Sequence, residues 1–223
     1  MTTIADRLDR IRFLLGNRTD IDSRIVGWGA DAYLELGSSV PFVELENTVD
    51  DVFIPSPPTV VYAYPAGARS VKSLVGFVSA GSPYPIHRRD IRVIEKYQTV
   101  TPGRVTIWAP FKDSIVVRPS PATADVFRWR LWMKPTLATV VANTVLLMPE
   151  DWLIVFDHMA AMQGNMALGQ AEKAGQLNQL LHGDPHHPDR PGLIKQKILR
   201  NAAENVVSDY VTDPLIRPFT GVR

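Results

Sequence analysis

The chain of 223 residues contains no cysteine. Without thiols it can form no disulfide, no thiolate nucleophile and no zinc–cysteine site. Net charge is almost absent as well, because 24 basic side chains nearly balance 23 acidic ones and leave a formal charge of +1. This balance gives no global attraction to nucleic acid, although it leaves room for a local basic patch.

Long apolar runs are also missing. The first residues, MTTIADRLDR, lack the apolar core of a signal peptide, and the longest apolar stretches are broken by Asn143, Pro149 and Asp151. We therefore expect a protein that is made in the cytoplasm and has no membrane partner. The length is sufficient for a hydrophobic core in one large domain or two small ones.

The motifs of common enzymes are missing too. The sequence contains no Gly-x-Ser-x-Gly, no Walker loop and no His-Glu-x-x-His. GWGADA, residues 27–32, has the letters of a dinucleotide fingerprint, but a helical pattern precedes it where the fingerprint needs a strand. The acidic residues Glu44, Glu46, Asp50 and Asp51 are typical of a solvated surface. We therefore expect neither an enzyme nor a cofactor.

Apolar residues recur at helical spacing near both ends of the chain, and Thr3 and Asp6 form a capping-box pattern at the start of the first stripe. The stripes near the N-terminus are Ile4, Leu8, Ile11 and Leu15, then Ile21, Ile25, Trp28, Ala32 and Leu36. Those beyond residue 149 are Trp152, Phe156, Met159, Met166, Leu177 and Leu181, then Ile194, Ile198, Ala202 and Val206. They predict an N-terminal αα-hairpin, one long helix that runs to His182, and a further helix capped by Asp189.

Between residues 41 and 148 the pattern changes to the alternation typical of β-strands. The clearest strand, VFRWRLWMKP, has Phe127, Trp129, Leu131 and Met133 on one face and Arg128, Arg130, Trp132 and Lys134 on the other. The segments FVELE, TVVYAYP, RVTIWAP and SIVVRP are shorter strands of the same kind, and Pro110–Ser114 is expected to be the turn of a hairpin.

These patterns together predict an α+β fold. It consists of a discontinuous helical bundle with two N-terminal and two C-terminal helices, an inserted antiparallel β domain and an extended C-terminal arm. The expected boundaries are residues 1–40 for the N-terminal hairpin, 41–148 for the β insert, 149–206 for the C-terminal helices and 207–223 for the arm.

The segment HGDPHHPDRPG, His182 to Gly192, holds three of the five histidines. It lies between two expected helices, with Gly183 placed to end the first and Asp189 to start the second. Zinc usually draws its ligands from two well-fixed elements, and no cysteine or distant histidine pair completes a set here. A rigid proline-rich turn without a metal is the favoured interpretation. The alternative is a hydrolase in which this loop works with Asp184 or Asp189.

Two features of the sequence point to contact surfaces. Gly164, Gly169 and Gly175 lie inside the expected long helix, where each costs about 1 kcal/mol unless close packing with neighbouring helices compensates. Trp132 lies between basic residues on the polar face of its strand. It is either an interface anchor or a side chain covered by a loop of its own chain.

The C-terminal segment SDYVTDPLIRPFTGVR is spaced by prolines and has no sustained period. Its apolar residues Leu215, Ile216 and Phe219 cannot be buried along one face of a helix. The segment therefore either packs back on its own domain or lies as an arm on a partner.

The order of these elements resembles that of the tailed-bacteriophage head-to-tail adaptor proteins, the ring-forming head-completion proteins beneath the portal. The resemblance covers residues 2–206. It rests on TTIADRLDRIRFLLGNRTD and ADAYLEL, on the insert with YAYPAGARSVKSLVGF and FRWRLWMKP, and on LMPEDWLIVFDHMAAMQGNMAL followed by GQAEKAGQL. One departure is Met148, which separates Leu147 from the proline that should follow it directly.

The resemblance implies a structural protein at the head–tail junction of a virion, assembled in the host cytoplasm. Its implied partners are the portal, neighbouring copies in a ring that is usually dodecameric, tail proteins, and packaged DNA that passes without sequence-specific contact. The arm would bind the portal through Leu215, Ile216, Arg217, Phe219 and Arg223. Packing between subunits would involve Met159, Gly164, Met166, Gly169 and Gly175, and the tail-facing contact would involve Arg130, Trp132 and Lys134. A second hypothesis is a tail or baseplate module whose β insert recognises other tail proteins.

Overall fold

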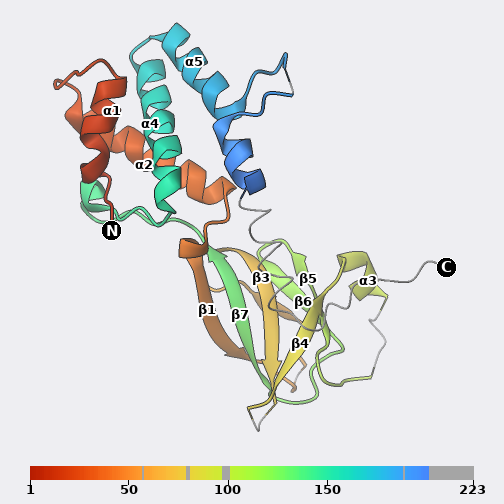
Figure 1. The fold of residues 1–223 in the computed structure, drawn as a ribbon. Coiled ribbons are helices and arrows are strands. Elements are labelled where there is room, and N and C mark those ends of the chain that lie inside the picture. Colours follow the sequence, from red (N-terminus) through yellow and green to blue (C-terminus); the bar gives the residue numbers. More distant parts are fainter. Residues whose placement is uncertain (57, 79–80, 97–100, 188, 201–223) are drawn as a thin grey trace. The chain divides into compact units, whose positions relative to one another are not determined.

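The computed structural model describes residues 1–56, 58–78, 81–96, 101–187 and 189–200 (Figure 1). These residues form a mixed α+β structure, as the sequence predicts. The chain divides into two compact units. Among the described residues, the helical unit consists of Met1–Leu36, Leu137–Leu146 and the residues from Glu150 to position 200, and the sheet unit consists of Gly37–Thr136 and Leu147–Pro149.

The helical unit begins with the capping box that the sequence predicts. The backbone N–H of Thr3 donates to the Asp6 carboxylate at 2.7 Å, and the N–H of Asp6 donates to the Thr3 hydroxyl at 3.3 Å. This cap starts a short 3₁₀ turn, η1 (Ala5–Arg7), which leads directly into α1 (Leu8–Leu14). The same N-terminal segment pairs with residues 144–146, just after the 3₁₀ turn η3 (Val141–Asn143), so distant parts of the sequence meet here.

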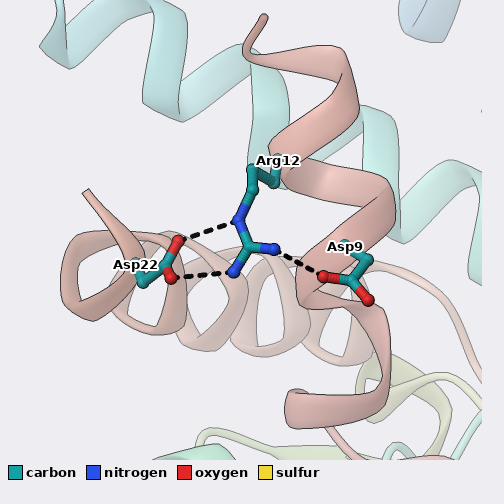
Figure 2. Close-up of polar contacts among 3 residues, drawn as sticks. All are labelled: Asp9, Arg12 and Asp22. Atoms are coloured by element: carbon teal, nitrogen blue, oxygen red, sulfur yellow. Dashed lines mark hydrogen bonds and ion pairs between the residues drawn. The ribbon is translucent and has the colours of Figure 1, made fainter. Parts of the chain in front are cut away.

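Arg12 on α1 holds the start of α2 (Asp22–Ser39), as Figure 2 shows. Its guanidinium donates to both carboxylate oxygens of Asp22, at 3.0 and 2.7 Å, and to Asp9 at 2.6 Å. The hydrogen bond to Asp22 raises the pKa of Arg12. Asp22 lies in the first turn of α2. Its negative carboxylate therefore also interacts favourably with the positive end of the helix dipole. One arginine therefore fixes the connection between the two N-terminal helices.

The C-terminal part of the helical unit corrects one expectation. In place of one long helix there are a 3₁₀ turn, η4 (Glu150–Trp152), and two helices, α4 (Leu153–Ala167) and α5 (Ala171–His182). Residues 193–200 are again helical, so the helix after the histidine loop starts beyond Asp189. In Figure 1, α1 and α5 lie beside α4, and both contact it. The predicted bundle arrangement and the C-terminal arm remain predictions.

Many members of the apolar stripes named above lie in the core of the helical unit, whereas Met166 and Ile198 are 65% and 40% exposed. Its fully buried side chains, each at most 1% exposed, include Ile4, Ile11, Ile25, Leu36, Trp152, Phe156 and Met159. All seven belong to the predicted stripes. Burial of these side chains is the main source of stability for helices this short.

The sheet unit contains, among the described residues, one sheet of seven strands in the spatial order β1-β7-β3-β4-β5-β6-β2. The strands are β1 (Glu46–Val52), β2 (Val61–Ala63), β3 (Ala68–Phe77), β4 (Pro83–Arg88), β5 (Ile107–Phe111), β6 (Ser114–Arg118) and β7 (Val126–Met133). A short helix, α3 (Ile91–Glu95), follows β4 and packs against β5 and β6.

Strand β7 confirms the predicted alternation. Phe127, Trp129 and Leu131 are completely buried, and the first of them stacks on Phe53 with ring centroids 4.2 Å apart. The hairpin around Pro110–Ser114 is also confirmed, because β5 and β6 pair antiparallel there. An aromatic cluster on one face of the curled sheet therefore provides the core of this unit.

Two expectations about the insert are wrong. Residues 43–45 of FVELE form a 3₁₀ turn, η2 (Val43–Leu45), and the strand begins only at Glu46. The apolar pair of that segment does not share a face, because Leu45 is buried whereas Val43 is 63% exposed. The sheet is also not purely antiparallel. Strands β4 and β5 pair parallel, since the chain passes through α3 between them and returns in the same direction.

Tyr84 on β4 covers a glycine in the neighbouring strand. Gly76 lies directly opposite, and a Cβ atom there would be 2.1 Å from the Tyr84 ring. The Tyr84 hydroxyl donates to the Asp125 carboxylate at 3.3 Å, and the Arg104 guanidinium lies 5.2 Å from the ring centroid. Burial, followed by the charge of Asp125, raises the pKa of Tyr84 to about 12.

This raised pKa predicts a loss of stability at alkaline pH. A phenol whose folded pKa exceeds its unfolded value stabilises the fold fully below about pH 10 and loses that contribution as the pH rises toward 12. We expect the free energy of unfolding to fall more steeply across this range in the wild type than in Tyr84→Phe, measured by urea denaturation. Parallel curves for the two proteins would contradict the assignment.

Candidate functional site

A short connection between α4 and α5 creates the candidate site. The N–H of Leu168 donates to the Gly164 carbonyl at 3.0 Å and the N–H of Gly169 to the Met166 carbonyl at 3.1 Å, which ends α4. Gly169 has φ of +72°, a left-handed conformation that glycine adopts without strain. This glycine therefore terminates a helix, whereas the sequence analysis places it inside one.

The reversal lays α5 against α4 and leaves a groove of about 560 Å³ on the helical unit. We call it the α4–α5 groove. Its apolar lining is Met162, Met166, Gly169, Ala171, Ala174 and Gly175, and its polar lining is Glu35, Asn178 and His182. Small side chains admit a closely approaching partner, and methionine adapts its shape to different partners. An apolar floor with a polar rim is typical of a surface that contacts another protein.

Three residues that the sequence analysis assigns to packing between subunits meet in this groove. Met166 is 65% exposed, and Gly169 and Gly175 are also exposed. Apart from Gly175, its two chain neighbours and the nearby backbone of α5, no atom of the described residues lies within 4 Å of the position that a Cβ of Gly175 would occupy. Packing within the described chain therefore does not require a glycine at this position of α5.

The other two members of that predicted set are buried within their own unit, which corrects the expectation for them. Met159 is 1% exposed. A Cβ on Gly164 would lie 2.7 Å from the Trp28 ring and 3.0 Å from Leu15. This glycine lets α4 approach its own neighbours, so its cost to the helix is offset by close packing inside the unit.

Comparison with known proteins identifies no family for this chain. No protein-family profile matches the chain, and no curated protein matches it either. The function is therefore inferred from the residues themselves and from the order of the elements.

Trp132 in the sheet unit is half-buried on the outer face of β7. The Lys72 ammonium lies 5.0 Å from the centroid of its ring, and that ammonium also forms an ion pair with Glu46 at 2.5 Å. Arg130 and Lys134 on the same face are exposed. The tryptophan is thus covered in part by its own sheet, and its contact with a partner remains a prediction.

The histidine loop forms a closed turn. Gly183 ends α5 with φ of +93°, as the sequence predicts, and pairs with Pro191 across the loop. Asp184 accepts hydrogen bonds from the backbone N–H groups of His186, through its carboxylate, and of His187, through its carbonyl. One of the two carboxylates named in the hydrolase alternative, Asp184, is therefore engaged in shaping the turn.

Within the described ranges, no group of three or more His, Asp or Glu side chains gathers closely enough to hold a metal ion. Residues 27–32 lie inside α2, where the dinucleotide fingerprint has no strand to precede it. None of the helices that the structure describes is both long and apolar enough to cross a membrane.

The predicted acidic cluster is divided between different partners. Asp50 on β1 forms a bidentate ion pair with Arg128 on β7, and that hydrogen bonding lowers the pKa of Asp50. Glu46 pairs with Lys72. These carboxylates stabilise the edge of the sheet, which is consistent with a solvated surface.

The predicted portal-binding residues Leu215, Ile216, Arg217, Phe219 and Arg223 lie outside the described residues. Among the described ones, the sequence analysis missed a groove at the end of β4, described below. Its signal is the run HRRDIR, residues 87–92, which has three arginines within five positions.

Proposed function

We propose that this chain is a structural protein of a tailed-bacteriophage virion. It is a head-to-tail adaptor that forms a ring beneath the portal, extends the DNA channel and provides the platform on which the tail docks. The resemblance in element order supports this function, and the observation that carries it is the exposed α4–α5 groove. Met166, Gly169 and Gly175, which the resemblance assigns to packing between subunits, line that one surface.

A ring contact also accounts for the glycine at position 175. A glycine inside a helix costs about 1 kcal/mol relative to alanine, and here no packing within the described chain compensates for it. In a ring, a helix of the neighbouring copy would fill the groove and approach α5 at this point. The formal charge of +1 also suits a channel through which DNA must slide, because a strongly basic ring would hold it.

The arm completes this proposal. Residues 207–223 would reach the portal, with Leu215, Ile216 and Phe219 as apolar anchors and Arg217 and Arg223 as charged contacts. The protein would be monomeric or weakly associated alone and would form its ring, a dodecamer by the family pattern, on the portal.

The test is the addition of purified protein to portal rings encoded by the same genome, read by mass photometry. Full-length protein is expected to add a ring of copies, whereas a truncation ending at Val206 is expected to add none. If both add equally, the arm assignment is wrong and the adaptor function stands. If neither adds, the adaptor function is wrong, and the tail or baseplate module becomes the leading hypothesis.

A further inference from the structure

A second groove, of about 540 Å³, lies on the sheet unit where β4 ends. We call it the arginine groove. It is lined by Arg88, Arg89, Asp90, Ile91, Val93 and Pro110. The lining therefore comes from the end of β4, from α3 and from β5, and it combines guanidinium groups with small apolar surfaces.

The backbone of the groove is held firmly in place. The N–H of His87 donates to the Thr106 carbonyl at 2.9 Å, and the N–H of Arg89 donates to the Trp108 carbonyl at 2.8 Å. Ile94 of α3 is 1% exposed where this helix packs against the sheet. The arginine side chains thus extend from a fixed scaffold, which lowers the entropic cost of binding a ligand.

The arginines of this groove form no ion pair with any carboxylate among the described residues. Arg88, Arg89 and Arg92 are exposed, and no described carboxylate lies within 4.0 Å of their guanidinium groups. Five other arginines have such a partner: Arg7, Arg12, Arg18, Arg104 and Arg128. Since the chain as a whole is almost neutral, an unpaired cluster of arginines creates a local positive field.

The orientation of Arg88 leaves its guanidinium available to a ligand. Its guanidinium lies 5.6 Å from the centroid of the Trp108 ring, and stacking of this kind holds an arginine in place while its N–H groups stay available. Asp90 is the one acidic residue in the lining, and its carboxylate accepts the N–H of Arg92 at 2.8 Å. That contact orients the carboxylate toward the backbone of α3.

We propose that the arginine groove binds the phosphate backbone of a nucleic acid. The planar fork of arginine matches a phosphate group in two parallel hydrogen bonds. Lys112 follows the lining residue Pro110 by two positions, in the turn after β5, beside the 47% exposed ring of Phe111. Several exposed cations on one unit suit a ligand with repeating phosphates better than a single carboxylate. This inference is independent of the proposed ring, because it depends only on side chains of the sheet unit.

The test measures binding of full-length protein to a fluorescein-labelled duplex DNA of mixed sequence by fluorescence anisotropy over a range of salt concentrations. The double variant Arg88→Gln/Arg89→Gln is expected to bind about tenfold or more weakly near 0.1 M salt, and the slope of log K against log salt should decrease by about two. The matched control Arg10→Gln/Arg24→Gln removes the same charge at exposed positions of the helical unit and should bind as the wild type does.

A variant that binds DNA more tightly distinguishes the loss of groove charge from a loss of binding caused by misfolding. Asp90→Asn keeps an acceptor for the N–H of Arg92 and removes the negative charge from the groove, so it is expected to bind DNA about threefold or more tightly. The proposal is overturned if wild-type protein does not bind at low salt, if the control pair weakens binding as much as the groove pair, or if polyglutamate competes as well as unlabelled DNA. The last result would identify an acidic protein as the ligand. A single-stranded probe shows which form of nucleic acid is preferred.

Discussion

Replacement of Arg7 by methionine is expected to lower the free energy of unfolding by about 3–5 kcal/mol. The Arg7 guanidinium forms two hydrogen bonds with the carboxylate of Asp157, one of them 2.9 Å from Nε to Oδ1. Their side chains are only 11% and 4% exposed. Methionine can fill the space of the arginine, but it leaves a carboxylate on α4 buried without a counter-charge.

Urea denaturation of the wild type and the variant measures this loss, and the chain offers a matched control. Arg128 and Asp50 form a similar bidentate pair on the surface of the sheet, where their side chains are 45% and 49% exposed. Arg128→Met is expected to cost much less than Arg7→Met, because water screens a pair on the surface. The double variant Arg7→Met/Asp157→Leu should recover much of the loss, since it removes both buried charges. An equal effect of Arg7→Met and Arg128→Met would show that the buried pair has no special role.

The effect of Arg7→Met should also depend on pH. Burial raises the pKa of Asp157, and its hydrogen bonds with Arg7 oppose that rise. An acid with a raised folded pKa stabilises the fold fully below its unfolded pKa, and this contribution is lost as the pH rises through the folded value. Removal of Arg7 raises the folded pKa of Asp157 further. The deficit of the variant should therefore be largest near neutral pH and shrink as the pH falls.

The sequence alone gives no sign of this pair. Arg7 and Asp157 are 150 positions apart, and their spacing fits no local motif. Each residue also occupies a position where a charged side chain on the solvent face of a helix is the ordinary expectation. Contacts that join the two ends of a chain depend on how the helices cross, which periodicity does not determine. Local patterns such as the Thr3–Asp6 cap depend only on neighbours, and that cap is predicted correctly.

The strands also differ in how well local sequence predicts them. β7 alternates so clearly that its buried face follows from its residues, whereas β1 and β4 were not predicted. β1 is an acidic edge strand, ENTVDDV, that depends on its pairing with β7 and on the ion pair of Asp50 with Arg128. β4 begins PYP, and proline ordinarily argues against a strand. Its place in the sheet depends on pairing with strands distant in the sequence, so local propensity underestimates it.

Only three of the nine residues that line the α4–α5 groove, Met166, Gly169 and Gly175, were assigned to packing between subunits from the sequence, and the groove itself was not predicted. Gly164, Gly169 and Gly175 look alike in the sequence, because each is a glycine within a long apolar pattern. The structure gives them three different roles: close packing inside the unit, termination of a helix, and an exposed position with open space around it. Only the surroundings of each residue in three dimensions distinguish these roles, and they lead to opposite predictions for the same substitution.

Gly164→Ala and Gly175→Ala are expected to change stability in opposite directions. A Cβ at residue 164 would meet Trp28 and Leu15 at 2.7 and 3.0 Å, so Gly164→Ala should lower the free energy of unfolding by about 1–3 kcal/mol despite the better helix propensity of alanine. At residue 175 the space is open, and Gly175→Ala should raise stability by about 1 kcal/mol. Urea denaturation of both variants measures the two effects, and a loss at both positions would contradict the open site at Gly175.

The proposed ring adds a second expectation for Gly175→Ala. A methyl group in the α4–α5 groove would obstruct a helix of a neighbouring copy, so the more stable variant should add to portal rings less completely than the wild type, measured by mass photometry. Substitution of the neighbouring exposed Gln176 by alanine is the control, because it changes α5 outside the α4–α5 groove. Stability and assembly that rise together would show that the groove is not the contact between copies. Stability that rises while assembly falls would mean that the glycine is retained for the neighbour and not for the fold.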